Sequence, residues 1–157
     1  METTNVMRIL SQKKIDFTPH CLENAEGLSG SEMAAGLGQE PERVFKTLVT
    51  VGKTKNYYVF MIPVEEELDL KKAAKAVGEK SIEMIKSKEL LPLTGYVHGG
   101  CSPIGMKKSF KTVVQNSAAN YDTVMFSAGK IGHQIETNIN NLSKVIRFEF
   151  KDVIVSD

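Results

Sequence analysis

A lysine in the middle of an apolar strand pattern is the first residue whose chemistry needs an explanation. In residues 43–51, RVFKTLVTV, side chains alternate between two faces, and one face carries Val44, Lys46 and Leu48. Burying an ammonium group between apolar neighbours is costly unless a partner stabilises its charge. Two interpretations remain open: the stem of Lys46 packs while its amine reaches water, or Lys46 serves a bound ligand.

A glycine-rich segment, GGCSPIG at residues 99–105, is the second candidate. Gly99 and Gly100 allow close approach of a ligand and free the φ angles that a nest of N–H donors requires. Ser102 and Pro103 then stiffen the turn. Such a loop can hold a carboxylate, a phosphate or an oxyanion, although an ordinary glycine turn between strands has the same composition. The spacing matches neither a dinucleotide-binding fingerprint nor a P-loop.

Two side chains could act as nucleophiles. Ser127 lacks the GxSxG setting and has no Asp–His pair placed to activate it, so a hydrogen-bonding role suits it better. Cys101 lies three residues after His98, which makes a Cys–His nucleophile conceivable, but free cysteines are usually small packing residues. The three histidines are scattered without metal-ligand spacing. We therefore expect no metal and no cofactor.

Composition limits the class of protein. A chain of 157 residues, 41% hydrophobic and 25% charged, predicts one globular domain over residues 1–157. The net charge of +1 argues against strong, non-specific nucleic-acid binding, but it permits an enzyme that touches only the end of an RNA. Lys107, Lys108 and Lys111 follow the glycine loop and could meet RNA phosphates. With no signal peptide pattern and no apolar run of about 18 residues, we expect a cytoplasmic protein without membrane contact.

The elements that must position these residues mix helices and strands without βαβ alternation. This favours an α/β fold with a mixed sheet or barrel and flanking helices. Ser29 and Glu32 have capping-box spacing, Asp69 and Gly78 bracket a helix, and Ser81 could cap another. Periodicity predicts helices over 4–14, 29–37, 69–78, after 81 and after 140, and strands over 15–20, 43–51, 56–63, 95–98, 111–115, 123–127, 134–139 and 147–155.

Four segments together resemble a known family. They are VFKTL at 44–48, LDLKKAAKAVG at 68–78, GGCSPIGMKK at 99–108 and SAGKIGHQIE at 127–136, and the resemblance is to the YbaK/EbsC family of prolyl-tRNA-associated editing proteins. It covers nearly the whole chain. The resemblance implies the prolyl-tRNA editing domain fold. It also implies deacylation of Cys-tRNA(Pro), with Cys-tRNA(Cys) as a second substrate, beside prolyl-tRNA synthetase as partner.

The resemblance also implies a site. Lys46, Gly99, Gly100 and Ser127 would serve catalysis. Lys46 would orient the 3′ adenosine or stabilise the leaving oxygen, and the glycine amides would hold the carbonyl oxygen or the α-amino group. The substrate's own thiol would attack its carbonyl and form a thiolactone. The expected substrate contacts are Ser102, Pro103, Gly129 and Lys107.

Two departures from some family members bear on substrate preference, since Leu22 replaces a tyrosine and Gln134 an aspartate. Three other functions remain open. They are an Ala- or Ser-tRNA deacylase that uses water, a non-catalytic module that binds tRNA ends or nucleotides, and a thiol enzyme built on Cys101.

Overall fold

Two β-sheets with flanking helices form the structure, a computed structural model that describes residues 2–156. The ends of the expected domain, Met1 and Asp157, lie outside the described residues. One sheet is antiparallel with the order β1-β7-β6, and the other is mixed with the order β4-β2-β3-β5-β8. The predicted α/β class is confirmed. The strands are β1 (Thr18–Cys21), β2 (Phe45–Gly52), β3 (Tyr57–Pro63), β4 (Ile82–Met84), β5 (Lys111–Gln115), β6 (Val124–Lys130), β7 (His133–Thr137) and β8 (Phe148–Lys151).

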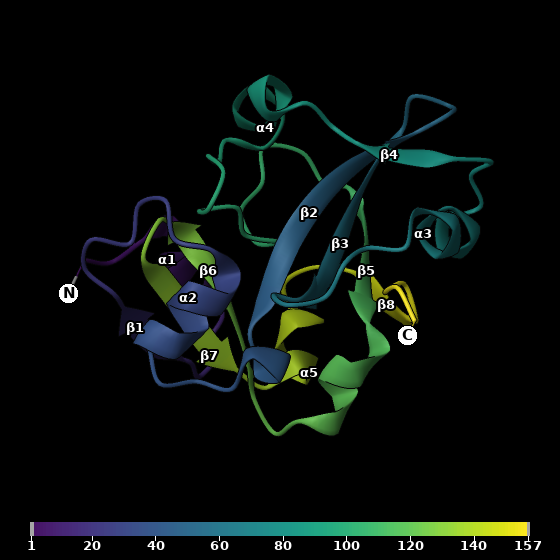
Figure 1. The fold of residues 1–157 in the computed structure, drawn as a ribbon. Coiled ribbons are helices and arrows are strands. Elements are labelled where there is room, and N and C mark those ends of the chain that lie inside the picture. Colours follow the sequence, from purple (N-terminus) through teal and green to yellow (C-terminus); the bar gives the residue numbers. More distant parts are fainter. Residues whose placement is uncertain (1, 157) are drawn as a thin grey trace.

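Helices cover the two sheets from different sides. In Figure 1, α1 and α2 lie beside the three-stranded sheet. The helix α3 lies on the other side of the β2–β3 hairpin, next to β4, and α4 lies above β2, joined to β4 by a loop. Their bounds are α1 (Asn5–Gln12), α2 (Gly30–Gly36), α3 (Leu70–Val77), α4 (Ser87–Thr94) and α5 (Ile139–Leu142). Two short 3-10 helices, Pro41–Arg43 and Asn116–Asn120, complete the order.

Local sequence signals explain two of the helix boundaries. The N–H of Glu32 donates to Ser29 Oγ at 3.1 Å, and the N–H of Ser29 donates to the Glu32 carboxylate at 2.9 Å. This is the capping box that the sequence predicts for α2. Asp69 caps α3 through the N–H groups of the first turn, and Gly78 ends it with φ of 77°. Both predictions are confirmed.

The β2–β3 hairpin is the centre of the larger sheet. Its antiparallel register runs from Phe45 opposite Pro63 to Val51 opposite Tyr57. Phe60, Met61 and Ile62 are fully buried, as expected for a strand covered on both faces. Because β2 and β3 carry packed side chains on both faces, the position of each β2 side chain is strongly fixed.

Two expectations about the chain between the hairpin and the glycine loop are wrong. Ser81 does not begin a helix, because residues 82–84 form β4 and pair with residues 50–52 of β2. Tertiary pairing that satisfies a strand edge overrides the local capping signal. Pro92 lies inside α4, which ends two residues later, and residues 95–98 form no strand.

Smaller differences occur elsewhere. The helix predicted after 140 begins earlier, because Asn138 caps α5 with its side-chain oxygen accepting from the N–H of Asn140. The last strand, β8, is shorter than the predicted 147–155.

No helix in residues 2–156 is both long and apolar enough to cross a membrane.

Candidate active site

The site lies where one edge of β2 changes neighbours. At one end, Val44 forms an isolated parallel bridge with Met125 of β6. At the other end, residues 50–52 pair with β4. Within the described chain, no strand pairs with this edge of residues 45–49, and a cleft of about 520 Å³ occupies the gap. The sheets thus meet at β2 and leave an opening between two of its neighbours.

Besides β2 and Val64, which directly follows β3, four parts of the chain line this cleft. They are the start of α2, the β4–α4 connection, the glycine loop, and the paired strands β6 and β7. The lining residues are Leu28, Ser29, Gly30, Met33, Val44, Phe45, Lys46, Thr47, Leu48, Val49, Val64, Met84, Ile85, Lys86, Ser87, Leu90, His98, Gly99, Cys101, Ser127 and Gln134. A second hollow of about 260 Å³ adjoins it and shares Ser29, His98 and Gly99.

Lys46 lines the cleft and is half-buried. No hydrogen bond or ion pair to its amine is seen within residues 2–156. Burial lowers the pKa of this amine, and the more distant charges of Glu67 and Glu66 partly oppose the shift. Within the described residues, the Lys46 amine therefore has no direct protein partner, which agrees both with an amine that reaches water and with one that binds a ligand.

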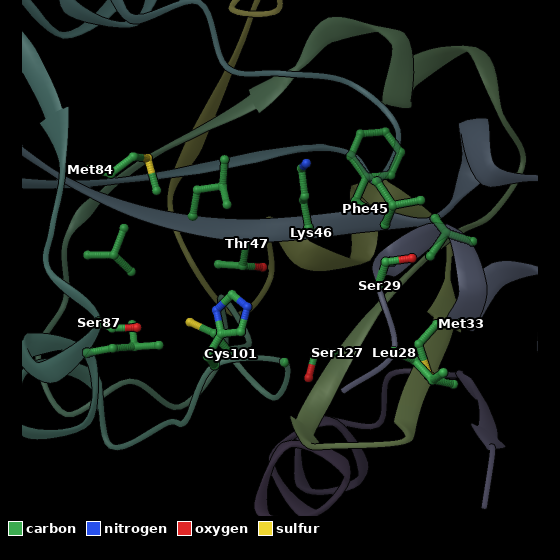
Figure 2. Close-up of a pocket in the computed structure, with 18 of the residues that line it drawn as sticks. Leu28, Ser29, Met33, Phe45, Lys46, Thr47, Met84, Ser87, Cys101 and Ser127 are labelled. Atoms are coloured by element: carbon green, nitrogen blue, oxygen red, sulfur yellow. The ribbon is translucent and has the colours of Figure 1, made fainter. Parts of the chain in front are cut away.

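Thr47 leaves β2 in the opposite direction from Lys46. Figure 2 shows the Lys46 amine on one side of the strand, and Thr47 on the side where Cys101 and Ser127 lie. The cleft therefore reaches around the open edge of β2 and touches both of its faces. Ser127 and Gln134 are cross-strand partners on β6 and β7, so their side chains stand next to each other.

Two oxygen atoms in this part of the cleft wall lack hydrogen bonds. The hydroxyl of Thr47 and the side-chain Oε1 of Gln134 are buried and have no partner. Buried polar atoms usually have one, and an unpaired one costs free energy. Thr47 is not apparent as a site residue from the sequence, because a threonine in a strand is ordinary, and Gln134 is apparent only as a departure from some family members. The one sequence signal for Thr47 is its polar side chain in a largely apolar strand, and Thr50 shares that signal.

Cys101 and Ser127 do not have the surroundings of nucleophiles. Cys101 packs with Val49 and Val59, and burial raises the pKa of its thiol to about 12. The thiol is therefore protonated at neutral pH, whereas a nucleophilic cysteine needs a lowered pKa. Ser127 Oγ accepts from the N–H of Gly129 at 3.0 Å, and no histidine side chain is hydrogen-bonded to either residue within the described chain.

The glycine loop makes a tight turn before it reaches the cleft. The N–H of Gly100 donates to the C=O of Val97 at 3.0 Å, and Gly99, with φ of 87°, occupies the turn position that favours glycine. Gly99 lines the cleft. Gly100 instead abuts the β6–β7 turn, because an added Cβ would lie 3.1 Å from the N of Ile131. Its amide is thus already used within the turn.

The structure brings Lys46, Gly99 and Ser127 to one cleft. The other expected site residues do not line it; they are Gly100, Ser102, Pro103, Gly129 and Lys107. Ser102 is fully buried, and its Oγ accepts from the N–H of Ile104 at 3.3 Å. Gly129 packs against Tyr96, and Lys107 lies against Gly95. No group of three or more His, Cys, Asp or Glu side chains within residues 2–156 could hold a metal ion.

Comparison with known proteins gives consistent matches. Residues 25–145 match the aminoacyl-tRNA editing domain family. The chain is 42% identical over 157 residues to the protein named "Putative Cys-tRNA(Pro)/Cys-tRNA(Cys) deacylase EbsC" from Enterococcus faecalis (strain ATCC 700802 / V583), with 99% of this chain and 96% of that protein covered.

Two solved structures share the fold. The "hypothetical protein APE2540" has a TM-score of 0.83 at 20% identity, covering 96% of this chain and 99% of that one. A structure titled "putative trans-editing enzyme for prolyl tRNA synthetase" has a TM-score of 0.79 at 22% identity, covering 96% and 95%.

Proposed function

Because the chain belongs to the aminoacyl-tRNA editing domain family, we propose that it is a free-standing editing enzyme that removes cysteine from tRNA(Pro). It is an aminoacyl-tRNA deacylase, and Cys-tRNA(Cys) is its proposed second substrate. The observation that carries the proposal is 42% identity, across 99% of the chain, to a protein named for this activity. We further propose that residues 1–157 form a single deacylase domain.

The cleft accounts for how such a substrate would bind. The aminoacyl ester would lie against Thr47, Ser127 and Gly99, and the terminal nucleoside would extend along the cleft around the open edge of β2 towards Lys46. Lys46, on the other face of β2, would orient the 3′ adenosine or stabilise charge on the leaving oxygen. An aminoacyl ester is already activated. One or two such donors, worth about 3–4 kcal/mol each, then supply roughly 10²–10³ in rate apiece.

The proposed reaction uses the thiol of the substrate. Its sulfur forms a bond to the substrate's own carbonyl carbon, the ester C–O bond breaks, and the thiol proton ends on the ribose oxygen of the released tRNA. The product is a four-membered thiolactone that water then opens to cysteine. The protonated thiol of Cys101 and the absence of a base hydrogen-bonded to Ser127 within the described chain support this route. A substrate that carries its own nucleophile does not need one from the protein.

A deacylation panel tests the proposal. We expect Cys-tRNA(Pro) to be cleared far faster than Ser-tRNA(Pro), Ala-tRNA(Pro) and Pro-tRNA(Pro), and blocking the cysteine thiol to abolish the reaction. Equal rates on Cys-tRNA and Ser-tRNA would contradict attack by the substrate thiol and favour water. Binding of charged tRNA without turnover would indicate a binding module instead.

We propose prolyl-tRNA synthetase as the partner that supplies tRNA specificity, in the cytoplasm where tRNA is charged. The net charge of +1 supports weak, salt-sensitive binding of bare tRNA by the isolated protein. Binding of tRNA(Pro) and of an unrelated tRNA should be equally weak without the synthetase. Tight and selective binding of tRNA(Pro) by the protein alone would contradict this arrangement.

A further inference from the structure

We propose that Thr47 and Gln134 bind the α-amino group of the aminoacyl moiety at the open edge of β2. The inference rests on the proposed function for its choice of substrate. It differs from the expectation that amides of the glycine loop hold that group, since the Gly100 amide is used within its own turn.

The backbone of Thr47 is the first support. Alternate residues of an antiparallel strand direct their N–H and C=O groups to the same neighbour. The N–H of Val64 donates to the C=O of Val44, so the even-numbered residues of β2 face β3. The odd-numbered residues face the other side, where the N–H of Ile85 donates to the C=O of Val49. The C=O and N–H of Thr47 therefore point into the gap between β6 and β4.

The unpaired side-chain atoms are the second support. The Thr47 hydroxyl and the Gln134 Oε1 are buried without partners, and Gln134 itself is only 8% exposed. Both residues line the cleft, and the C=O of Thr47 faces the same open edge of β2, so three oxygen acceptors border this part of it. The primary ammonium of a cysteinyl group offers three N–H donors, one for each of these acceptors. A ligand amine would give these atoms the partners they lack.

The distribution of charge in the cleft is the third support. Its described lining contains Lys46 and Lys86 but no Asp or Glu. The Lys46 amine lies on the opposite side of β2 from Thr47 (Figure 2). A charged tRNA carries anionic phosphates on one side of its ester and a basic amine on the other. The phosphates match the lysine side of the open edge, and the amine matches the neutral acceptors of the Thr47 side.

This arrangement has a consequence for selectivity. The secondary ammonium of a prolyl group has two N–H donors, one fewer than a cysteinyl group. Leaving one buried acceptor unpaired would disfavour Pro-tRNA(Pro) by on the order of tenfold. The amine site therefore adds protection of the correctly charged tRNA to the selection made by the thiol.

The test compares two substrates with the same thiol. One is Cys-tRNA(Pro), and the other is tRNA(Pro) charged with 3-mercaptopropionate, which lacks only the amino group. Because the amino group also activates the ester, each variant is compared with the wild type on the same substrate. We expect Thr47→Val and Gln134→Met each to lower kcat/KM for Cys-tRNA(Pro) by roughly tenfold, and to change the rate on the deamino substrate less than about twofold.

Thr50→Val is the matched control. It makes the same substitution on the same strand, outside the cleft, where the Thr50 hydroxyl donates to the C=O of Tyr58. It should leave both rates unchanged. Equal slowing of both substrates by Thr47→Val and Gln134→Met, with unchanged melting temperatures, would overturn the amine site.

The failure of the proposed function would look different. If the wild type cleaves Ala-tRNA in place of Cys-tRNA, the same comparison is made with propionyl-tRNA. The amine site is then tested by whether the variants slow Ala-tRNA more than propionyl-tRNA. Variants that fail to fold are replaced by Thr47→Ser, which keeps the hydroxyl and should retain the wild-type ratio of the two rates.

Discussion

Replacing Lys46 by methionine should separate stability from activity. The substitution keeps a long, flexible side chain and removes only the charge. Burial lowers the pKa of the Lys46 amine from its ordinary value of 10.5, so the charged form is less favourable in the folded chain than in the unfolded one. Removing the charge breaks no ion pair. We therefore expect Lys46→Met to be at least as stable as the wild type at neutral pH.

The sign of the pH dependence follows from the same shift. For a lysine whose pKa is lowered by folding, the unfolded chain binds more protons between the folded pKa and 10.5. The stability cost of the wild-type lysine is thus fully present below the folded pKa and disappears as the pH rises from that value to 10.5. The stability gap between Lys46→Met and the wild type should narrow accordingly. Urea unfolding at a series of pH values measures it.

Activity should respond in the opposite way. A single group that stabilises charge on the reacting oxygen is worth about 2.7–4 kcal/mol, so deacylation should fall by roughly 10²–10³. Single-turnover deacylation of Cys-tRNA(Pro) measures this loss. A loss in kcat would point to the leaving oxygen, and a loss mainly in KM would point to the 3′ adenosine. Lys53→Met, on the exposed tip of the same hairpin, is the matched control and should change neither quantity. Full activity in Lys46→Met would refute the role of this charge.

Three further outcomes are expected. Cys101→Ala should keep activity within about threefold, because its thiol, with a pKa of about 12, is protonated at neutral pH. Lost packing should lower its stability by roughly 1 kcal/mol. An inactive but folded variant would favour a thiol enzyme. Gly100→Ala should lower kcat/KM by about 10–100-fold, because the added Cβ would lie 3.1 Å from the backbone of the β6–β7 turn and would displace the loop. Unchanged kinetics would show that the position of the loop is not critical. A hydrogen bond from the Thr123 hydroxyl, and to a lesser extent one with His20, lowers the pKa of Glu136 below its ordinary 4.5. The ionised Glu136 therefore stabilises the fold above pH 4.5, and this stabilisation is lost as the pH falls through the folded pKa. In Glu136→Gln, the urea concentration at the unfolding midpoint should therefore fall less steeply than in the wild type as the pH is lowered below 4.5. The same fall in both proteins would exclude this contribution of Glu136.

The sequence predicts those helix boundaries that depend only on interactions between residues close together in the chain. The capping box at Ser29 and the glycine stop at Gly78 were readable because each is decided within a few residues. Ser81 shows where this fails. The following segment becomes β4 because the edge of β2 needs a partner, and that partner is some 30 residues away in the chain.

The candidate site divides in the same way. Lys46 stands out because a lysine is unusual in an apolar strand, and Gly99 stands out because it belongs to a segment with three glycines within seven residues. Thr47 and Gln134 do not, because polar residues are common in strands. Their significance depends on which strand lies beside β2 at each position, and on which polar atoms remain unpaired after packing. Neither property is written in the local sequence.

The opening at the edge of β2 also has a length that the strand pairings on either side of it fix. Five residue steps separate the bridge at Val44 from the hydrogen bond at Val49, a span of about 17 Å at roughly 3.4 Å per residue. Its length can change only if a strand pairing moves, so point substitutions alter what the opening recognises without altering its size. A deletion of one residue before Lys46 would exchange its face with that of Thr47. Insertions and deletions here should therefore be far more damaging than substitutions, and specificity can evolve on one face while the other is kept.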